Sequence, residues 1–565
     1  MTLARRGVTV DAAAAPLSPA PGAEPASPVL ARLISGERLI RVAVHIACWV
    51  PFIASAADSW RGPWRATGDG ARTALMSWGT LTNHIPLVGL ANELPHTTAH
   101  TPYDLGPMQL WLMAIPVHID PDRGVLWGAA LLAMLATWLT VEAGYSVLGE
   151  TGGLLAGGVV IATVAWFPSF AVYPYENPNY GMIFFLASLS ACLAVLSGHR
   201  KWWPVLVVTA SMAAQAYLTY AVASVGLVLI AAVTGLVAAF RDKGGYSWLI
   251  GGLIAGAACW LAPLDQQFTS PAGQGNMSLL LQEDAGPHVG VGFAMKVLAL
   301  LTAPSSLWWR ENISLRGNLY QLLSSKPTAL GFVILAITAA SLVIAVCWLR
   351  SRELAGLAAI SLLVSVTAAA TFARIPAQSN AIGGVHRPWG DLPLIFVMFA
   401  AALLAWLTVI CVTVLAAARL ISGRRGRVAP AQGGGPGGEQ RVRQHPVLRS
   451  ARLAGALLIV MTALLVLGVR QVANYQGEGT YSLRVSAALP MIERSVPRHG
   501  LITLKVSPQA DWYRVGTGLQ WALIGDGYLY TTRNRGNHII SNITVIIRPH
   551  STTVRIRLKE LIPDD

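Results

Sequence analysis

The feature that most constrains the fold is a series of long apolar runs spread along almost the whole chain. Eleven of them approach the length of about 20 residues that a helix needs to cross a bilayer, and they lie at 39–57, 124–146, 153–171, 180–197, 203–219, 220–240, 247–263, 328–349, 354–371, 393–418 and 453–470. Within lipid, only helices and closed barrels satisfy all their backbone hydrogen bonds, and runs of this length are typical of helices. The sequence therefore predicts an α-helical polytopic membrane protein with about 11–13 spans.

The overall composition excludes a water-soluble fold. The 565 residues are 54% hydrophobic and only 12% charged, with 19 tryptophans and a mean hydropathy of +0.53. The net charge of +14 would suggest nucleic acid in a soluble protein. Here much of the Arg and Lys lies in short loops between apolar runs, which is typical of membrane topology signals. We expect membrane lipids and no nucleic acid as partners.

The basic loops predict the orientation in the plasma membrane. Basic residues flank the apolar runs at 199–201, 241–243 and 350–352 and fill the loop after Arg419, and these segments are expected to be cytoplasmic. The loops 58–104, 172–179, 264–327 and 372–392 are then external. The run at 105–119 is short and contains Pro107 and Pro116, so we expect it not to cross the membrane.

These assignments divide the chain into five parts. They are a cytoplasmic tail at 1–38, a transmembrane core at 39–420, a basic cytoplasmic linker at 421–452, a last span at 453–470 and an external domain at 471–565. The last part has a mixed polar and β-branched composition. It predicts strands at 501–506, 527–532, 543–548 and 553–558 and a helix at 511–522, which make a small α/β domain.

The first external loop carries a candidate for a general base. Asp69 lies in Thr67-Gly-Asp-Gly-Ala71, where the two glycines allow a substrate to approach the backbone closely. If the reaction is sugar transfer from a lipid phosphate, the acceptor hydroxyl needs such a carboxylate, and the departing phosphate needs cationic partners. Asp is also a common residue at helix N-termini, so capping of a helix that starts at Ala71 explains the same position.

Two other external loops hold candidate ligand contacts. His386, Arg387 and Arg374 could hold a phosphate, although an arginine beside Trp389 is equally typical of the membrane interface. The turn at 173–180 places Glu176, Asn177 and Asn179 among tyrosines, a composition suited to sugar hydroxyls, and turn formation explains the same residues.

The histidines of the first external loop predict no metal site. His84, His96 and His100, with Glu93 and Asp104, match no metal-ligand spacing. The sequence indicates no certain cofactor and leaves open a divalent cation beside a phosphate.

Several short motifs, in this order, resemble the multi-span class C glycosyltransferases, especially a large uncharacterised actinobacterial group. They begin with Gly68-Asp-Gly-Ala71, His84-Ile-Pro-Leu-Val-Gly89 and Gly106-Pro107. Tyr175-Glu-Asn-Pro178, Trp260-Leu-Ala-Pro-Leu-Asp-Gln266 and Gly275-Asn276 follow, and the resemblance covers most of residues 39–420. The end of the chain, with Trp512 and Gly516-Thr-Gly-Leu519, is similar to the small domain that ends many of these proteins.

The resemblance implies an inverting transfer of a sugar, arabinose or mannose, from a polyprenyl-phosphate donor to an extracytoplasmic glycan or lipid of the cell envelope. It implies that an acid of the first external loop is the base, and Asp69 matches that position, which favours catalysis over capping. The stretch from His100 to Pro107 departs from the family's His-Pro-Gly-Pro segment, so the roles of His100 and Asp104 stay open.

Two other classes of function compete with the enzyme. A transporter or lipid flippase would need ionisable groups inside its spans, and the predicted spans contain few, with Glu142 near an end. A non-catalytic envelope scaffold would use the same architecture without the chemistry at Asp69.

Overall fold

The computed structural model describes most of the apolar core and parts of the C-terminal region. The described residues are 36–60, 64–81, 85–91, 102–282, 288, 290–303, 329–374, 388–425, 451–473, 479–495, 501–506, 516–525, 529–532, 542–548 and 553–557.

The apolar runs form a bundle of helices, as the sequence predicts. Among the described residues, eight helices are long and apolar enough to cross a membrane. They are α2 (Gly36–Ser59), α5 (Gly124–Leu148), α8 (Asn177–Leu196), α10 (Leu218–Asp242), α11 (Tyr246–Thr269), α15 (Ala329–Val343) continued by η3 (Ile344–Leu349), α16 (Arg352–Ala373) and α17 (Pro388–Arg425). The predicted class of polytopic helical membrane protein is thus confirmed.

Further helices complete the bundle. They are α4 (Met108–Ile119), α6 (Glu150–Trp166), α7 (Ser169–Val172), α9 (Trp203–Ala216), α13 (Val291–Thr302) and α18 (Ala451–Ala473). The predicted non-spanning run corresponds to α4, which has 12 residues and therefore a length of roughly 18 Å, well short of a hydrocarbon core of roughly 30 Å. It packs between α5 and the loop helix α3 (Gly68–Thr80).

The core of the bundle surrounds α8. Buried side chains of α8 pack against α5, α9, α10, α16 and α17, and 83% of its apolar window is buried, compared with 17% for α11 at the edge. The exposed apolar side chains of the outer helices need a lipid environment, because so much apolar surface is costly in water.

The C-terminal region forms the predicted α/β unit. A mixed sheet has the strand order β2-β1-β3-β4, in which β1 (Leu501–Val506) pairs parallel with β2 (Leu529–Thr532) and antiparallel with β3 (Asn542–Arg548), and β3 pairs antiparallel with β4 (Thr553–Arg557). The helices α19 (Gly479–Ser495) and α21 (Thr517–Gly525) lie beside this sheet and contact it. All four strands fall within one or two residues of their predicted positions.

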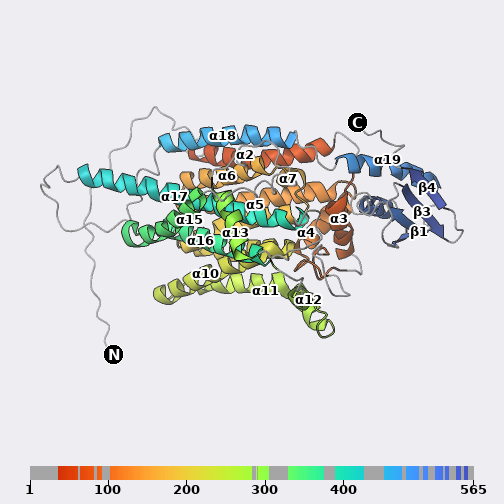
Figure 1. Ribbon diagram of the computed structural model, residues 1–565, viewed down its shortest axis with the longest axis horizontal. Helices are drawn as coiled ribbons and strands as arrows, with labels where there is room; N and C mark the ends of the chain where they lie inside the picture. The colour runs from red at the N-terminus through yellow and green to blue at the C-terminus, as the bar shows by residue number, and fades with distance from the viewer. Residues whose placement is uncertain are drawn as a thin grey trace, which may run out of the picture.

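The two ends of the bundle differ in character (Figure 1). One end, here called the α3 end, carries α3, α12 (Asn276–Gln282) and the C-terminal sheet. The other, here called the basic end, holds Arg200 bonded to Asp242, and Arg419 bonded to the carbonyl of Leu349. By the positive-inside rule, we expect the basic end to face the cytoplasm.

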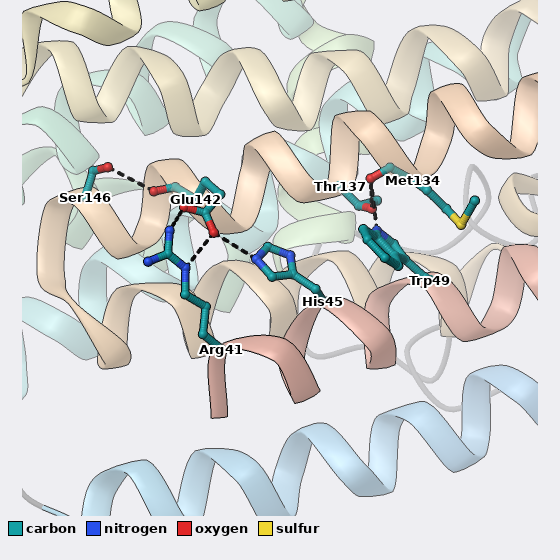
Figure 2. A network of polar contacts seen from close by, with 7 residues as sticks. All are labelled: Arg41, His45, Trp49, Met134, Thr137, Glu142 and Ser146. Atoms are coloured by element: carbon teal, nitrogen blue, oxygen red, sulfur yellow. Dashed lines mark hydrogen bonds and ion pairs between the residues drawn. The ribbon is translucent and has the colours of Figure 1, made fainter. Parts of the chain in front are cut away.

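An ion-pair network joins α2 to α5 (Figure 2). Arg41 donates from Nε to Glu142 Oε1 at 2.7 Å and pairs through Nη2 with the other carboxylate oxygen, while His45 Nε2 lies 2.8 Å from Oε1. The Arg41 guanidinium also lies over the ring of Tyr145, at 5.0 Å from its centroid. Because Glu142 and His45 are buried, the network fixes how α2 packs on α5.

We predict that removal of one partner from this network destabilises the protein and that removal of both restores part of the loss. Glu142→Leu leaves Arg41 without its carboxylate, so the free energy of unfolding should fall, whereas Arg41→Leu/Glu142→Leu should recover part of it, with a coupling energy of about 2 kcal/mol. Thermal unfolding in lipid nanodiscs measures the effect.

The control for this experiment is the exposed pair of Arg200 and Asp242. Asp242→Leu should change the free energy of unfolding by less than about 1 kcal/mol, because the carboxylate is largely solvated. Equal losses for Glu142→Leu and Asp242→Leu would contradict the predicted role of the network.

Candidate active site

The α3 helix places Asp69 at the polar end of the bundle. The helix begins at Gly68, whose φ of +52° suits glycine, and Thr67 is the N-cap residue with an extended backbone. Asp69 therefore lies in the first turn of the helix. The capping interpretation required Asp69 to be the N-cap residue, and Thr67 holds that position instead. A carboxylate in this turn is stabilised by the helix dipole, and its side chain keeps 20% of its surface exposed.

Arg72 faces Asp69 one turn along α3. Its Nη1 lies 3.5 Å from Asp69 Oδ1, and its Nη2 donates to the carbonyl of Ala91 at 3.3 Å. Because the pair is long and Asp69 is partly exposed, the carboxylate still has a side that an incoming group could contact. Arg72 also links α3 to the segment at 85–91.

Asp104 lies at the centre of a buried set of hydrogen bonds. It is 2% exposed, and Asn177 Nδ2 donates to its Oδ2 at 2.6 Å. Its backbone pairs with the segment at 85–91, where Gly89 N donates to Asp104 O and Asp104 N to Leu90 O. Asn276 Nδ2 donates to the carbonyls of Tyr103 and Asp104 at 3.0 and 3.4 Å. Three loops far apart in the sequence therefore meet at this residue.

The turn at 173–180 is held by Asn179 and by Gln109 of α4. Asn179 Nδ2 lies within hydrogen-bond distance of the carbonyls of Ser169 and Tyr173 and of Glu176 Oε2. Gln109 Nε2 donates to the carbonyl of Tyr175 at 2.7 Å. The amide of Asn179 is thus used within the turn, whereas Asn177 Oδ1 is buried and has no hydrogen-bond partner among the described residues.

A close contact joins this turn to α3. A Cβ atom at Gly70 would lie only 2.7 Å from the ring of Tyr175, so glycine is required next to Asp69. Tyr175 also meets the rings of Trp64 and Tyr173 edge to face, at centroid distances of 6.1 and 5.9 Å. The first external loop and the turn at 173–180 are therefore packed against each other, and the predicted residues Asp69, Asp104, Glu176, Asn177 and Asn179 belong to one region.

The C-terminal helix α21 covers α3. Trp521 is buried, packs edge to face on Trp78 at 5.8 Å, and donates to the carbonyl of Pro121 at 2.8 Å. Trp78 stacks in turn on His118 of α4 at 3.9 Å. At the start of α3, Thr517 Oγ1 donates to the carbonyl of Gly68 at 3.4 Å, one residue before Asp69.

Within the described chain, Arg374 is a predicted site residue that is not joined to this region. Arg374 is exposed just after α16, and within the described chain no hydrogen bond or ion pair connects it with Asp69. His100, His386 and Arg387 lie outside the described residues. The described residues contain no group of three or more His, Cys, Asp or Glu side chains that could hold a metal ion.

Sequence reasoning missed four polar residues that build the site. The sequence does not indicate Arg72 as a partner of Asp69. It also does not indicate Asn276 as a partner of the loop at 103–104. Gln109 and Gln215 lie in apolar runs, where a buried amide needs hydrogen-bond partners. Gln215 donates to the carbonyl of Cys259 at 2.7 Å, and a Cβ at Gly106 would collide with its side chain. An amide side chain within an apolar run is the sequence signal that indicates Gln109 and Gln215 as polar residues of the site.

Comparisons with known proteins found similar solved structures. No family model and no curated protein match the chain. The structure is similar to ArnT from Cupriavidus metallidurans, solved bound to undecaprenyl phosphate, with 14% identity, a TM-score of 0.45, and 89% of this chain and 87% of that chain covered.

It is also similar to the oligosaccharyltransferase of Archaeoglobus fulgidus in its apo form, with 12% identity, a TM-score of 0.40, and 90% of this chain and 61% of that chain covered. Because the TM-scores are low, we base the proposed function on the contacts of the site itself.

We predict that Asn177→Leu lowers the free energy of unfolding by about 2 kcal/mol, because the buried Asp104 loses a charge-assisted hydrogen bond. Thermal unfolding in nanodiscs, with hydrogen exchange at 102–107, measures the loss. The control is Thr234→Val on α10, which removes a hydroxyl bonded only to its own helix. A loss no larger than that of the control would contradict the role of Asn177.

A second prediction concerns the packing of α21 on α3. Trp521→Ala should weaken the docking of the C-terminal region by about 3 kcal/mol, because a buried indole and its hydrogen bond are lost. Limited proteolysis should then release C-terminal fragments faster. Trp248→Ala, at an exposed tryptophan of α11, is the matched control, and equal cleavage of the two variants would contradict the prediction.

Proposed function

We propose that this protein is a membrane glycosyltransferase that transfers a sugar from a polyprenyl-phosphate donor to a glycan or lipid acceptor, with Asp69 as the general base. The observation that carries the proposal is a partly exposed carboxylate at the polar end of an apolar helical bundle, beside Arg72 and next to a buried amide-rich region. A donor with a long prenyl chain and a phosphate needs both an apolar environment and a polar group at its edge.

The chemistry requires a base and a means of stabilising the leaving phosphate. The acceptor hydroxyl oxygen attacks the anomeric carbon of the sugar, and the bond from that carbon to the phosphate oxygen breaks. Asp69 takes the proton of the hydroxyl, and the electron pair of the broken bond leaves with the polyprenyl phosphate. Attack from the face opposite to the phosphate inverts the anomeric configuration, which is the outcome we propose.

Cationic groups near Asp69 would stabilise the developing charge on the phosphate. Arg72 is the cation that lies beside Asp69, and one of its nitrogens is already bonded to the carbonyl of Ala91. We add it to Arg374, His386 and Arg387 as a proposed phosphate contact. His100 keeps its proposed place among the substrate contacts.

The sugar would lie against the turn at 173–180. Glu176, and the unpartnered Oδ1 of Asn177, are proposed to accept hydrogen bonds from its hydroxyls. Asn179 and Asp104 are proposed to act by holding the turn and the first external loop in place, because their polar atoms are engaged there. The positive-inside rule supports an extracytoplasmic position for this end of the bundle.

The test is transfer from defined donors by membranes that contain the protein. With arabinose or mannose on polyprenyl phosphate as the labelled donor, Asp69→Asn should lower the transfer rate by a factor of about 10² to 10⁴, since a positioned base contributes that much. Asp265→Asn on α11 is the matched control, because its carboxylate is exposed near the α3 end of the bundle and is expected to leave the rate unchanged.

Two results would contradict the proposal. Full activity of Asp69→Asn at normal expression would remove Asp69 as the base, and no transfer by the wild type from any polyprenyl donor would favour a scaffold. Transport is a further alternative, and the Arg41, His45 and Glu142 network is the observation that favours it, since ionisable groups inside spans often mark a pathway. Movement of lipid between leaflets by Asp69→Asn, but not by Glu142→Leu, would identify it.

A further inference from the structure

A cavity of about 310 Å³ lies in the half of the bundle that holds Arg350 and Arg419, and Asp69 is not part of its lining. Its walls come from α5, α6 and α8 on one side and from η3, α16 and α17 on the other. Along α17 the lining runs from Ala400 to Arg419, which corresponds to roughly 28 Å of helix. The lining is therefore long enough to follow an extended chain through the whole of one leaflet, which is about half of a hydrocarbon core of roughly 30 Å.

The cavity wall is mainly apolar. Leucines of four helices provide much of it, including Leu155, Leu193, Leu357, Leu403, Leu407 and Leu415. A soluble polar ligand would lose hydrogen bonds to water here without regaining them from the wall. A hydrocarbon chain loses nothing by entering, so the interior favours the chain of a lipid.

The mouth of the cavity carries positive charge. The charged residues of the cavity lining are Arg350, Arg419 and Glu353, so the lining carries a net positive charge. Glu353 Oε2 accepts a hydrogen bond from Ser351 Oγ at 2.7 Å, and Arg419 donates to the carbonyls of Trp348 and Leu349. Arg350 is exposed, and the N-terminus of the 22-residue helix α16 adds a partial positive charge.

We propose that this cavity binds one anionic phospholipid, with an acyl chain among the leucines and the phosphate at Arg350 beside the N-terminus of α16. The complementarity between an apolar interior and a rim of net positive charge matches that ligand class, since a lipid without net charge would leave the excess positive charge uncompensated. The site lies toward the opposite end of the bundle from α3, so the ligand is a component of the bilayer and not the sugar donor. It would stabilise the packing of α5, α6 and α8 against α16 and α17.

The test uses the full-length protein purified in detergent and analysed by native mass spectrometry with added lipids. Phosphatidylglycerol should remain bound in preference to phosphatidylcholine of the same chains. Arg350→Gln should weaken phosphatidylglycerol binding roughly fivefold, as expected for the loss of one basic contact at an anionic lipid. Ser190→Phe, which fills the cavity from α8, should remove binding of either lipid.

Two control variants separate the cavity from the general surface. Arg352→Gln removes an exposed arginine that does not line the cavity, and Val237→Phe enlarges a lipid-exposed side chain of α10. Both should bind phosphatidylglycerol as the wild type does. The same variants also give a stability readout, because added phosphatidylglycerol should raise the unfolding temperature of the wild type and of both controls but not of Ser190→Phe.

Several outcomes would overturn the proposal. Equal retention of phosphatidylglycerol and phosphatidylcholine would show that the rim does not select charge, and unchanged retention by Ser190→Phe would place the lipid elsewhere. Displacement of phosphatidylglycerol by stoichiometric undecaprenyl phosphate would assign the cavity to the carrier lipid instead. The outcome is independent of the glycosyltransferase activity, because no variant alters Asp69 or its neighbours.

Discussion

The contact between Gly70 and the ring of Tyr175 is the constraint on which the candidate site depends. It brings the first turn of α3 against a turn that lies about a hundred residues later in the chain, and no larger side chain fits at that position. Because Asp69 precedes Gly70 and Asn177 follows Tyr175 by two residues, one packing contact sets the positions of both. The hydrogen bond from Asn177 to Asp104 then ties in the end of the first external loop.

The segregation of polar groups follows from the bilayer. A chain with so many apolar runs must satisfy its backbone inside helices, and the remaining polar side chains gather where the helices end. Buried amides such as Gln109 and Gln215 are tolerated near those ends because each finds a carbonyl to bind. The Arg41 and Glu142 pair is an exception within a span, and the mutual neutralisation of its charges is what permits it.

Much of the fold could be predicted from the sequence because hydropathy and β-branched patterns act locally. The apolar runs predict most helices of the bundle, and β1 is predicted at its observed bounds, Leu501–Val506. The helix α13 is an exception, because it packs within the bundle although it lies in 264–327, which the sequence predicts to be an external loop. The sequence predicts Asp69 and the turn at 173–180 as parts of a site, and the structure brings the two segments into contact through Gly70 and Tyr175. The partners Arg72 and Asn276 could not be predicted from the sequence. Their contacts depend on how distant loops pack together, and no local pattern in one sequence specifies that packing. The start of α3 at Gly68 was missed because a glycine with positive φ gives no helix signal.

The docking of α21 on α3 has a consequence for biosynthesis. Trp521 packs on α3 within one apolar cluster, although it lies more than four hundred and fifty residues after Asp69 in the sequence. The two sides of this contact therefore emerge from the ribosome at very different times. While the later helices are being inserted, the apolar surface of α3 that Trp521 finally covers remains open. A nascent chain therefore lacks this contact until α21 has been synthesised and packs on α3, and a product that is terminated before α21 cannot form it.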